Sequence, residues 1–216
     1  SGTYYGNVTA GGSGTFDAIA RASTISSVTS SVAINGTNAV TVSISRAASS
    51  FTHTVVFSFG SYSKTTTGVG TSTSYAIPTS WINAMPSATS GTAKVTVTTY
   101  SGSTKIGSAV SKSFTLTVPA SVVPTISAVT ISEAVSGLAA QFGGYVQSKS
   151  KLAVTITAAG VYSSTIKSYK TTIQGANFTA ASFTSGVLSK SGTSTITITV
   201  TDSRGRTASA SATVTI

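Results

Sequence analysis

The segment Thr24-Ile-Ser-Ser-Val-Thr29 returns as Thr125-Ile-Ser-Ala-Val-Thr130, about one domain length further along a chain of 216 residues. Each copy opens a unit that closes with a strand–turn–strand pattern. Self-similarity at a fixed spacing is typical of repeated structural units. The repeat therefore predicts two similar domains, and each is long enough to bury a hydrophobic core of its own.

Working outward from the repeat, the hydrophobic pattern is that of β-strands. Apolar and polar residues alternate over 39–45 in the first unit, and over 152–156 and 196–200 in the second. This period of two is typical of half-buried strands, and the denser apolar run at 54–59 indicates a central strand. No segment has the pattern of a long helix. The pattern predicts an all-β fold of two tandem antiparallel immunoglobulin-like β-sandwiches.

Two proline-bounded segments interrupt this pattern. Pro78–Pro86 contains Trp81 and predicts a short helical turn, capped by Thr79 or Ser80, with the indole beneath it as a core residue. Pro119–Pro124 predicts a short, stiff linker, because proline restricts φ. The predicted organisation is a lead-in or the end of a preceding domain at 1–22, domain 1 at 23–118, the linker at 119–124 and domain 2 at 125–216.

Reactive side chains are scarce. The chain has no cysteine, and its acids are Asp17, Glu133 and Asp202. A glycosidase needs two carboxylates close together, and hard cations need several carboxylates, so neither site is expected. His53 is the single histidine and is expected at the surface. The sequence therefore predicts no enzyme, no catalytic residue, no metal and no cofactor.

The formal net charge of +10 has two interpretations. A basic surface attracts polyanions such as anionic cell-wall polysaccharide, whereas bases spread along the chain also serve as simple solubilising charge. Candidate ligand-binding residues are Tyr62 in a polar loop or hairpin, Trp81 as an aromatic platform if it is exposed, and Arg204 and Arg206 in the last turn. No nucleic-acid motif is present, so nucleic acid is not an expected partner. No apolar run is long enough to span a membrane.

Five passages, in this order, resemble tail-associated minor structural proteins of siphoviruses that infect Gram-positive bacteria. They are Arg21–Val28, Ser80–Thr92, Thr99–Gly107, Val123–Val135 and Thr201–Ser209. The resemblance implies a protein of the virion tail, outside the cell, with other virion tail proteins as partners. By analogy with tail symmetry it also implies a homo-oligomer, namely a trimer.

Composition and resemblance together favour a non-enzymatic tail or tail-fibre segment. Its role is that of a spacer or of a host-surface adhesion module, with Gram-positive cell-wall polysaccharide as the ligand of the adhesion module. The alternative is a bacterial surface adhesin or a carbohydrate-binding module of similar fold. An upstream virion-assembly domain would favour the first interpretation. A signal peptide and a wall anchor would favour the second.

Overall fold

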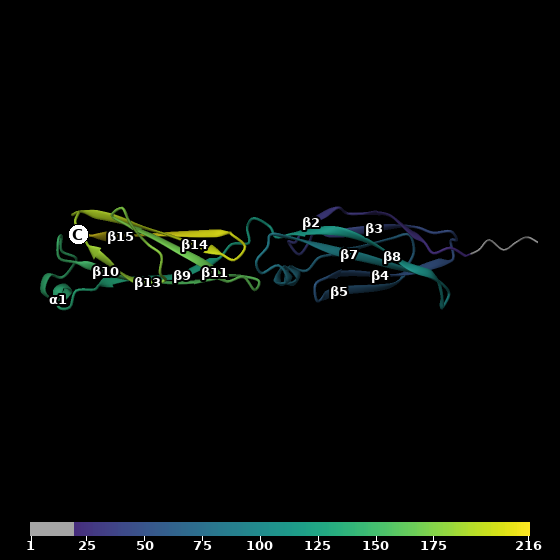
Figure 1. The fold of residues 1–216 in the computed structure, drawn as a ribbon, viewed down its shortest axis with the longest axis horizontal. Coiled ribbons are helices and arrows are strands. Elements are labelled where there is room, and N and C mark those ends of the chain that lie inside the picture. The colour runs from purple at the N-terminus through teal and green to yellow at the C-terminus, as the bar shows by residue number, and fades with distance from the viewer. Residues whose placement is uncertain (1–19) are drawn as a thin grey trace, which may run out of the picture.

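A computed structural model describes residues 20–216 (Figure 1). The first part of the chain, which we call the N-terminal lobe, forms two sheets from residues 24–117. A three-stranded sheet has the order β1-β3-β6, and a five-stranded sheet has the order β2-β8-β7-β4-β5. The elements are β1 (Thr24–Val28), β2 (Ser31–Ala33), β3 (Ala39–Ser45), β4 (Phe51–Phe59), β5 (Tyr62–Val69), β6 (Ser72–Ala76), the 3₁₀ turn η1 (Thr79–Ala84), β7 (Ser90–Ser101) and β8 (Thr104–Thr117).

Residues 125–216, the C-terminal lobe, form two further sheets. Their orders are β13-β10-β9 and β12-β11-β14-β15, and every pairing in them is antiparallel. The elements are β9 (Thr125–Glu133), α1 (Leu138–Phe142), β10 (Lys151–Ala159), β11 (Ile166–Ile173), β12 (Ala176–Phe178), β13 (Ser182–Val187), β14 (Thr193–Asp202) and β15 (Thr207–Thr215).

Each lobe has its own hydrophobic core, filled by the inward side chains of its strands. In β4 every second residue from Phe51 to Phe59 is buried, and in β14 Ile196, Ile198 and Val200 are buried. Burial of apolar surface of this kind is the main favourable contribution to folding. Separate clusters in the two lobes are consistent with two units that each bury their own apolar surface.

The strand pattern read from the sequence matches the structure at most positions. The two copies of the repeat begin β1 and β9, and the predicted strands at 39–45 and 54–59 lie in β3 and β4. Residues 62–69 are a strand that pairs with β4, so the predicted hairpin is the correct one of the two alternatives.

The helical turn predicted after Pro78 is confirmed as η1, but its predicted cap is wrong. Pro78 itself is the N-cap residue, and no side chain caps the turn. Proline suits this place because its fixed φ fits the start of a helix and its missing N–H has no intrahelical partner there.

The helix α1 has no counterpart in the sequence prediction. It lies in a long connection, Ala134–Ser150, between β9 and β10. The corresponding connection of the N-terminal lobe, residues 29–38 between β1 and β3, contains β2 and a turn in which the Asn35 side chain accepts the backbone N–H groups of Thr37 and Asn38. The two lobes therefore differ most at this loop.

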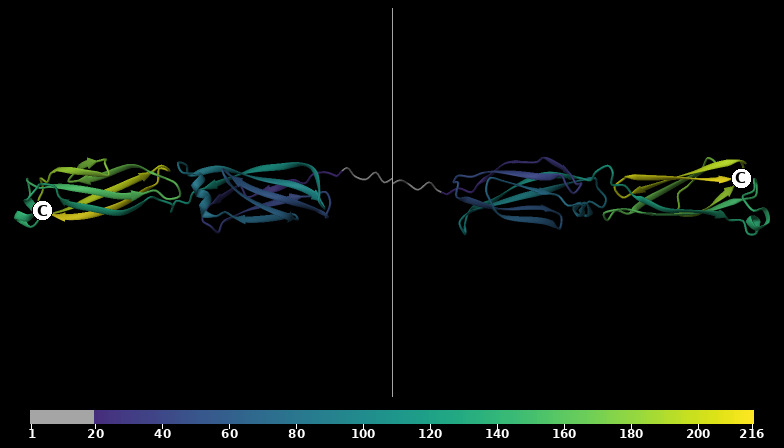
Figure 2. Two further views of the ribbon diagram at one scale, coloured as in Figure 1. Left: turned by 90° about the horizontal axis from the view of Figure 1, so that it is seen from below. Right: turned by 180° about the vertical axis from the view of Figure 1, so that it is seen from behind.

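The lobes lie end to end, with α1 and the C-terminus at the end of the C-terminal lobe that faces away from the N-terminal lobe (Figures 1 and 2). We call this the far end. The predicted lead-in at 1–22 falls largely on residues 1–19, which lie outside the described residues. Within residues 20–216, no helix has the length and apolar character needed to cross a membrane.

Candidate functional site

The turn between β14 and β15 is shaped by a buried carboxylate. Asp202 Oδ1 accepts the backbone N–H groups of Arg204 at 2.9 Å and Arg206 at 2.8 Å. Gly205 has φ of +83°, a conformation that favours glycine. Asp202 and Gly205 therefore form the turn, and the predicted position of the arginines in a turn is confirmed. The turn holds two arginines at the junction between the lobes.

Arg204 joins the two lobes through main-chain carbonyl groups. Its Nε donates to Met85 O at 2.7 Å and its Nη1 donates to Val161 O at 2.8 Å, while Nη2 contacts the carbonyls of Ile82 and Tyr162. The side chain is 7% exposed. Burial lowers the pKa of Arg204 and the nearby Asp202 raises it, but an arginine in a protein stays charged. Hydrogen bonds from a charged group are among the stronger ones.

Arg206 binds the segment that follows β8 in the same way. Nη1 donates to Pro119 O at 2.6 Å and Nη2 donates to Val118 O at 2.9 Å. Val122 of this segment packs against the hydrophobic core of the N-terminal lobe. The segment between β8 and β9 therefore contacts both lobes.

Two hydroxyl groups and one tyrosine complete the junction. Ser203 donates to Pro86 O, and Ser163 donates to Asn83 Oδ1 at 2.8 Å. Tyr162, from the connection between β10 and β11, packs against the core of the N-terminal lobe. The segment around η1, which the sequence marks as unlike the rest of its unit, is the surface that receives the C-terminal lobe.

Trp81 and Tyr62 form an aromatic cluster in the N-terminal lobe. Trp81 is 3% exposed, and its ring lies 5.9 Å from the Tyr62 ring and 5.7 Å from the Tyr75 ring, measured between centroids. The indole therefore fills the core beneath η1, as predicted from the sequence, and does not offer an open platform.

The structure gathers three of the four candidate residues, Trp81, Arg204 and Arg206, around the junction, and Tyr62 joins them through the Trp81 ring. Their hydrogen bonds and stacking contacts are made within the protein. These contacts give them structural roles. Ligand binding by these residues stays a prediction.

His53 is buried, so its predicted surface position is wrong. It is 0% exposed, its Nδ1 lies 2.7 Å from Gly70 O and its Nε2 lies 2.6 Å from Ser23 Oγ. It shares the inward alternation of Phe51 and Val55 in β4. That alternation was visible in the sequence and would have placed it correctly. The ring ties Ser23, just before β1, to the five-stranded sheet.

The far end of the C-terminal lobe has a different character. Glu133 Oε1 accepts the backbone N–H groups of Val135 at 2.9 Å and Lys151 at 3.2 Å, while Oε2 is buried without a hydrogen-bond partner among the described residues. Partial burial raises the pKa of Glu133, but these N–H groups and the nearby Ser150 hydroxyl outweigh it and hold the pKa below its usual value. The carboxylate therefore fixes the start of the long loop.

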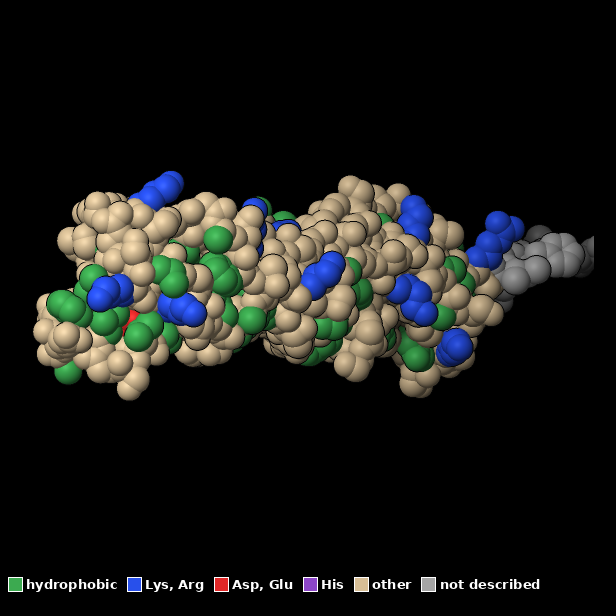
Figure 3. Space-filling model, turned by 60° about the vertical axis from the view of Figure 1, so that its left-hand side comes forward, with side chains coloured by type: hydrophobic (Ala, Val, Ile, Leu, Met, Phe, Trp, Pro, Cys, Tyr) green, Lys and Arg blue, Asp and Glu red, His purple; other side chains and the backbone are tan. Residues whose placement is uncertain are grey.

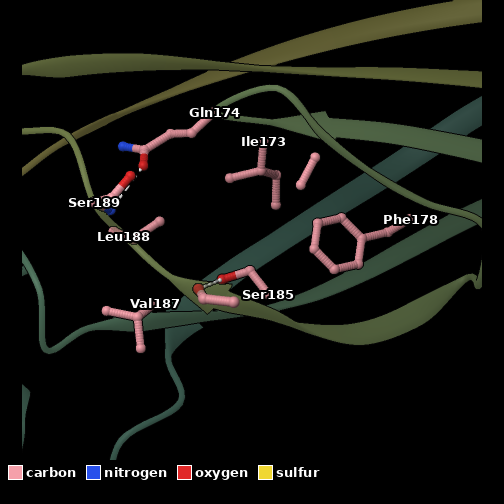
Figure 4. Close-up of a pocket in the computed structure, with 9 residues that line it drawn as sticks. Ile173, Gln174, Phe178, Ser185, Val187, Leu188 and Ser189 are labelled. Atoms are coloured by element: carbon pink, nitrogen blue, oxygen red, sulfur yellow. Dashed lines mark hydrogen bonds between the residues drawn. The ribbon is translucent and has the colours of Figure 1, made fainter.

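Two pockets lie at this end, on either side of β10. The first, of about 210 Å³, lies between the end of β13 and the β11–β12 hairpin (Figure 4). The Gln174 side chain closes one side of it, because its Oε1 accepts the N–H of Ser189 and its Nε2 donates to Lys190 O. The second, of about 290 Å³, is lined by Glu133, Ala139, Gly143, Gly144 and Tyr145.

Exposed apolar and basic side chains surround these pockets. Among the described residues, the large hydrophobic side chains that stand exposed are Phe142, at 50%, and Val187, at 48%. Lys149 Nζ lies 5.8 Å from the centroid of the Phe142 ring. Figure 3 shows hydrophobic side chains grouped at this end of the molecule, with basic side chains among them and also along the rest of this face. Nothing in the sequence pattern marked this surface, because it depends on how one long loop folds.

The chain is a mostly β protein with several sheets. The family model described as "Siphovirus protein of unknown function (DUF859)" matches residues 1–216, so the chain belongs to this siphovirus family. This confirms the resemblance identified from the sequence. No curated protein matches the chain.

Two solved structures match most of the chain at low sequence identity and low TM-score. The fibronectin(III)-like modules of Clostridium thermocellum CbhA share 14% identity, with 90% of this chain and 93% of that chain covered and a TM-score of 0.31. The YadV chaperone shares 11% identity, with 89% and 99% covered and a TM-score of 0.28.

Proposed function

We propose that this chain is a non-enzymatic structural segment of the virion tail or tail fibre, in which two immunoglobulin-like sandwiches form a rigid spacer that presents its far end to the host surface. Each lobe would be one sandwich, with residues 119–124 as the linker. The strand orders support this architecture, because each lobe packs one three-stranded sheet beside a larger sheet.

The proposal rests on the junction between the lobes, where hydrogen bonds from two arginines hold the lobes together. Arg204 is buried and donates to carbonyls of both lobes, and Arg206 holds the linker. Interfaces between domains of one chain commonly allow relative motion unless they are well packed. A junction built from several charge-assisted hydrogen bonds resists bending, and resistance to bending is what a spacer requires.

Catalysis has no part in the proposal. Between residues 20 and 216, the ionisable side chains that most often act as acid, base or nucleophile are Glu133, Asp202 and His53. Asp202 and His53 are buried and make hydrogen bonds within the fold. Glu133 accepts a backbone N–H group at the start of the long loop. No group of three or more metal-ligating side chains occurs in the described part of the chain.

Immunogold labelling of purified virions tests the location directly. Antibody raised against the C-terminal lobe should label the tail, and label at the capsid alone would contradict the proposal. Small-angle scattering of the purified chain tests the spacer. The wild type should give the maximum dimension of two lobes end to end, and a broad distribution of shorter dimensions would show a flexible linker instead.

A further inference from the structure

The first strand of each lobe continues in a different way. In the N-terminal lobe the chain leaves β1 and crosses to the larger sheet, where β2 pairs in parallel with Thr115–Thr117 of β8. Val32 and Ile34 of this crossing segment are buried and belong to the core. In the C-terminal lobe β9 stays beside β10 over its whole length. Within residues 20–216, β15 therefore has no strand on its outer edge.

The sequence explains why the second copy does not cross over. When the two copies of the repeat are aligned, Ile131 stands at the position of Ser30 and Glu133 at that of Val32. Ile131 continues the apolar pattern of Val129 and packs against the core of its own lobe, so the strand continues beside β10. A carboxylate cannot replace an apolar core residue, and Glu133 instead accepts N–H groups at the start of the long loop.

The outer edge of β15 is long and regular. Gly192 and Ile216 exchange two backbone hydrogen bonds, and β15 pairs with β14 from there without a register shift. Alternate residues of such a ladder bond to the neighbouring strand, so the N–H and C=O groups of Ser209, Ser211 and Thr213 face away from β14. Natural edge strands often carry lysine, proline or a bulge, which oppose the addition of another strand. β15 has none of these, whereas β8 has a register shift and two exposed lysines beyond the part that β2 covers.

Apolar side chains beside this edge are less well covered than those beside β2. In β8, Phe114 and Leu116 are buried. Five apolar side chains near the edge of β15 are half-buried or exposed only in part, namely Ile126, Val129, Ala208, Ala210 and Ala212. Partly exposed apolar surface next to unpaired backbone groups favours an extended polypeptide that brings apolar side chains of its own.

We propose that β15 accepts an extended strand from another virion protein, which pairs with it in parallel as β2 pairs with β8. The strand supplies two β-branched apolar side chains at alternate positions, the equivalents of Val32 and Ile34. A second copy of this chain fits less well, because the inward residues of its own open edge are mostly alanine. This inference rests on the virion location in the proposed function, and it names the surface and the kind of partner.

Hydrogen exchange of purified virions tests the partner. Peptides that cover 207–215 should exchange their amides about tenfold more slowly in the virion than in the purified chain, because the outward N–H groups gain acceptors. Peptides that cover β12, at the other edge of the same sheet, are the control and should exchange equally in both samples. Equal exchange of β15 in both samples would overturn the inference. Absence of tail labelling by immunogold would instead contradict the proposed function itself.

A strand attached to the chain tests whether the edge accepts one. A linker of about ten Gly and Ser residues after Ile216 is long enough to turn back along β15, and a copy of residues 30–35 follows it. This extension should raise the urea midpoint of unfolding and slow exchange of the β15 amides about tenfold. The same extension with serine in place of its valine and isoleucine is the control and should do neither.

A proline substitution separates pairing at the edge from folding of the lobe. Thr213 stands two residues before the end of β15, as Thr115 does in β8, where its N–H donates to Ser30 O at 2.9 Å. Thr213→Pro should leave the unextended chain folded and abolish the effect of the extension, because proline is tolerated where the N–H faces outward. Stabilisation that survives Thr213→Pro would overturn the site. A dimer of the unextended chain in sedimentation, dissociated by Thr213→Pro, would show a second copy as the partner and would also overturn the inference.

Discussion

The two ends of the C-terminal lobe both carry basic side chains, but they differ in how far these side chains are exposed. At the junction, Arg204 is 7% exposed and its guanidinium group is surrounded by carbonyl oxygens of both lobes. At the far end, Phe142 is 50% exposed, and Lys149 and Lys151 reach solvent. The cation at one end is buried among carbonyl groups of the protein, and the cations at the other end are exposed.

This difference shows how a chain with few acids uses its bases. With 13 bases and 3 acids, most cations have no carboxylate to pair with. At the junction, carbonyl oxygens replace carboxylates, and the arginines become structural. At the far end, Lys149 and Lys151 are exposed, and Lys149 Nζ lies over the Phe142 ring. The predictions below compare matched residues at the two ends.

The largest effect is expected from the aromatic residues. Trp81→Ala should lower the free energy of unfolding by about 4 kcal/mol, because it empties a packed core position beneath η1 and removes the support of the junction. Phe142→Ala should change it by less than about 0.5 kcal/mol, because the ring is half exposed. Urea unfolding of both variants measures this. A large loss for Phe142→Ala would show that the far end is a core element.

The next effect is expected at the arginine that joins the lobes. Arg204→Ala should cost about 3 kcal/mol, because several carbonyl groups would lose a charged donor. Arg204→Lys should recover only part of this, since an ammonium group cannot reproduce the fork of a guanidinium. Unfolding curves measure the loss, and small-angle scattering should show a wider range of lobe arrangements. Lys190→Ala, a loss of charge at the far end, is the control and should leave both readouts unchanged.

A pair of glycines gives a smaller, steric comparison. A Cβ added at Gly160 would overlap the carbonyl oxygen of Ser164, so Gly160→Ala should distort the loop that contacts the N-terminal lobe. We expect a loss of about 2 kcal/mol. Gly144, at the far end, has open space around the same position, and Gly144→Ala should be neutral within about 0.5 kcal/mol. Equal melting temperatures of the two variants would contradict the close packing of the junction loop.

The smallest effect concerns pH. Because the pKa of Glu133 is lowered in the folded state, the unfolded chain binds the proton more readily, and the carboxylate stabilises the fold above the unfolded pKa. This stability is lost as the pH falls through the folded pKa, below the ordinary value of 4.5. Glu133→Gln should therefore flatten the fall in stability as the pH drops below the ordinary carboxyl value of 4.5. Parallel curves for the wild type and the variant would show that Glu133 does not contribute.

Several elements could be predicted from local pattern alone. The alternation at 39–45 and 196–200 acts over a few residues, and the structure has strands at both places, as predicted. His53 was misplaced although its alternation with Phe51 was visible, because a polar residue was expected outside. Its ring nitrogens have partners from residues far away in the chain, and this pairing allows its burial.

The sequence by itself determined the strands, the repeat, the helical turn after Pro78 and the scarcity of reactive groups, since these depend on side-chain period, proline geometry and composition. Only the tertiary structure decided the roles of the arginines and of the long loop. Arg204 and Arg206 look like exposed bases in a turn, yet their partners are carbonyls many residues away. The far-end surface likewise combines side chains from α1, β9, β10 and β13, and only folding brings these together.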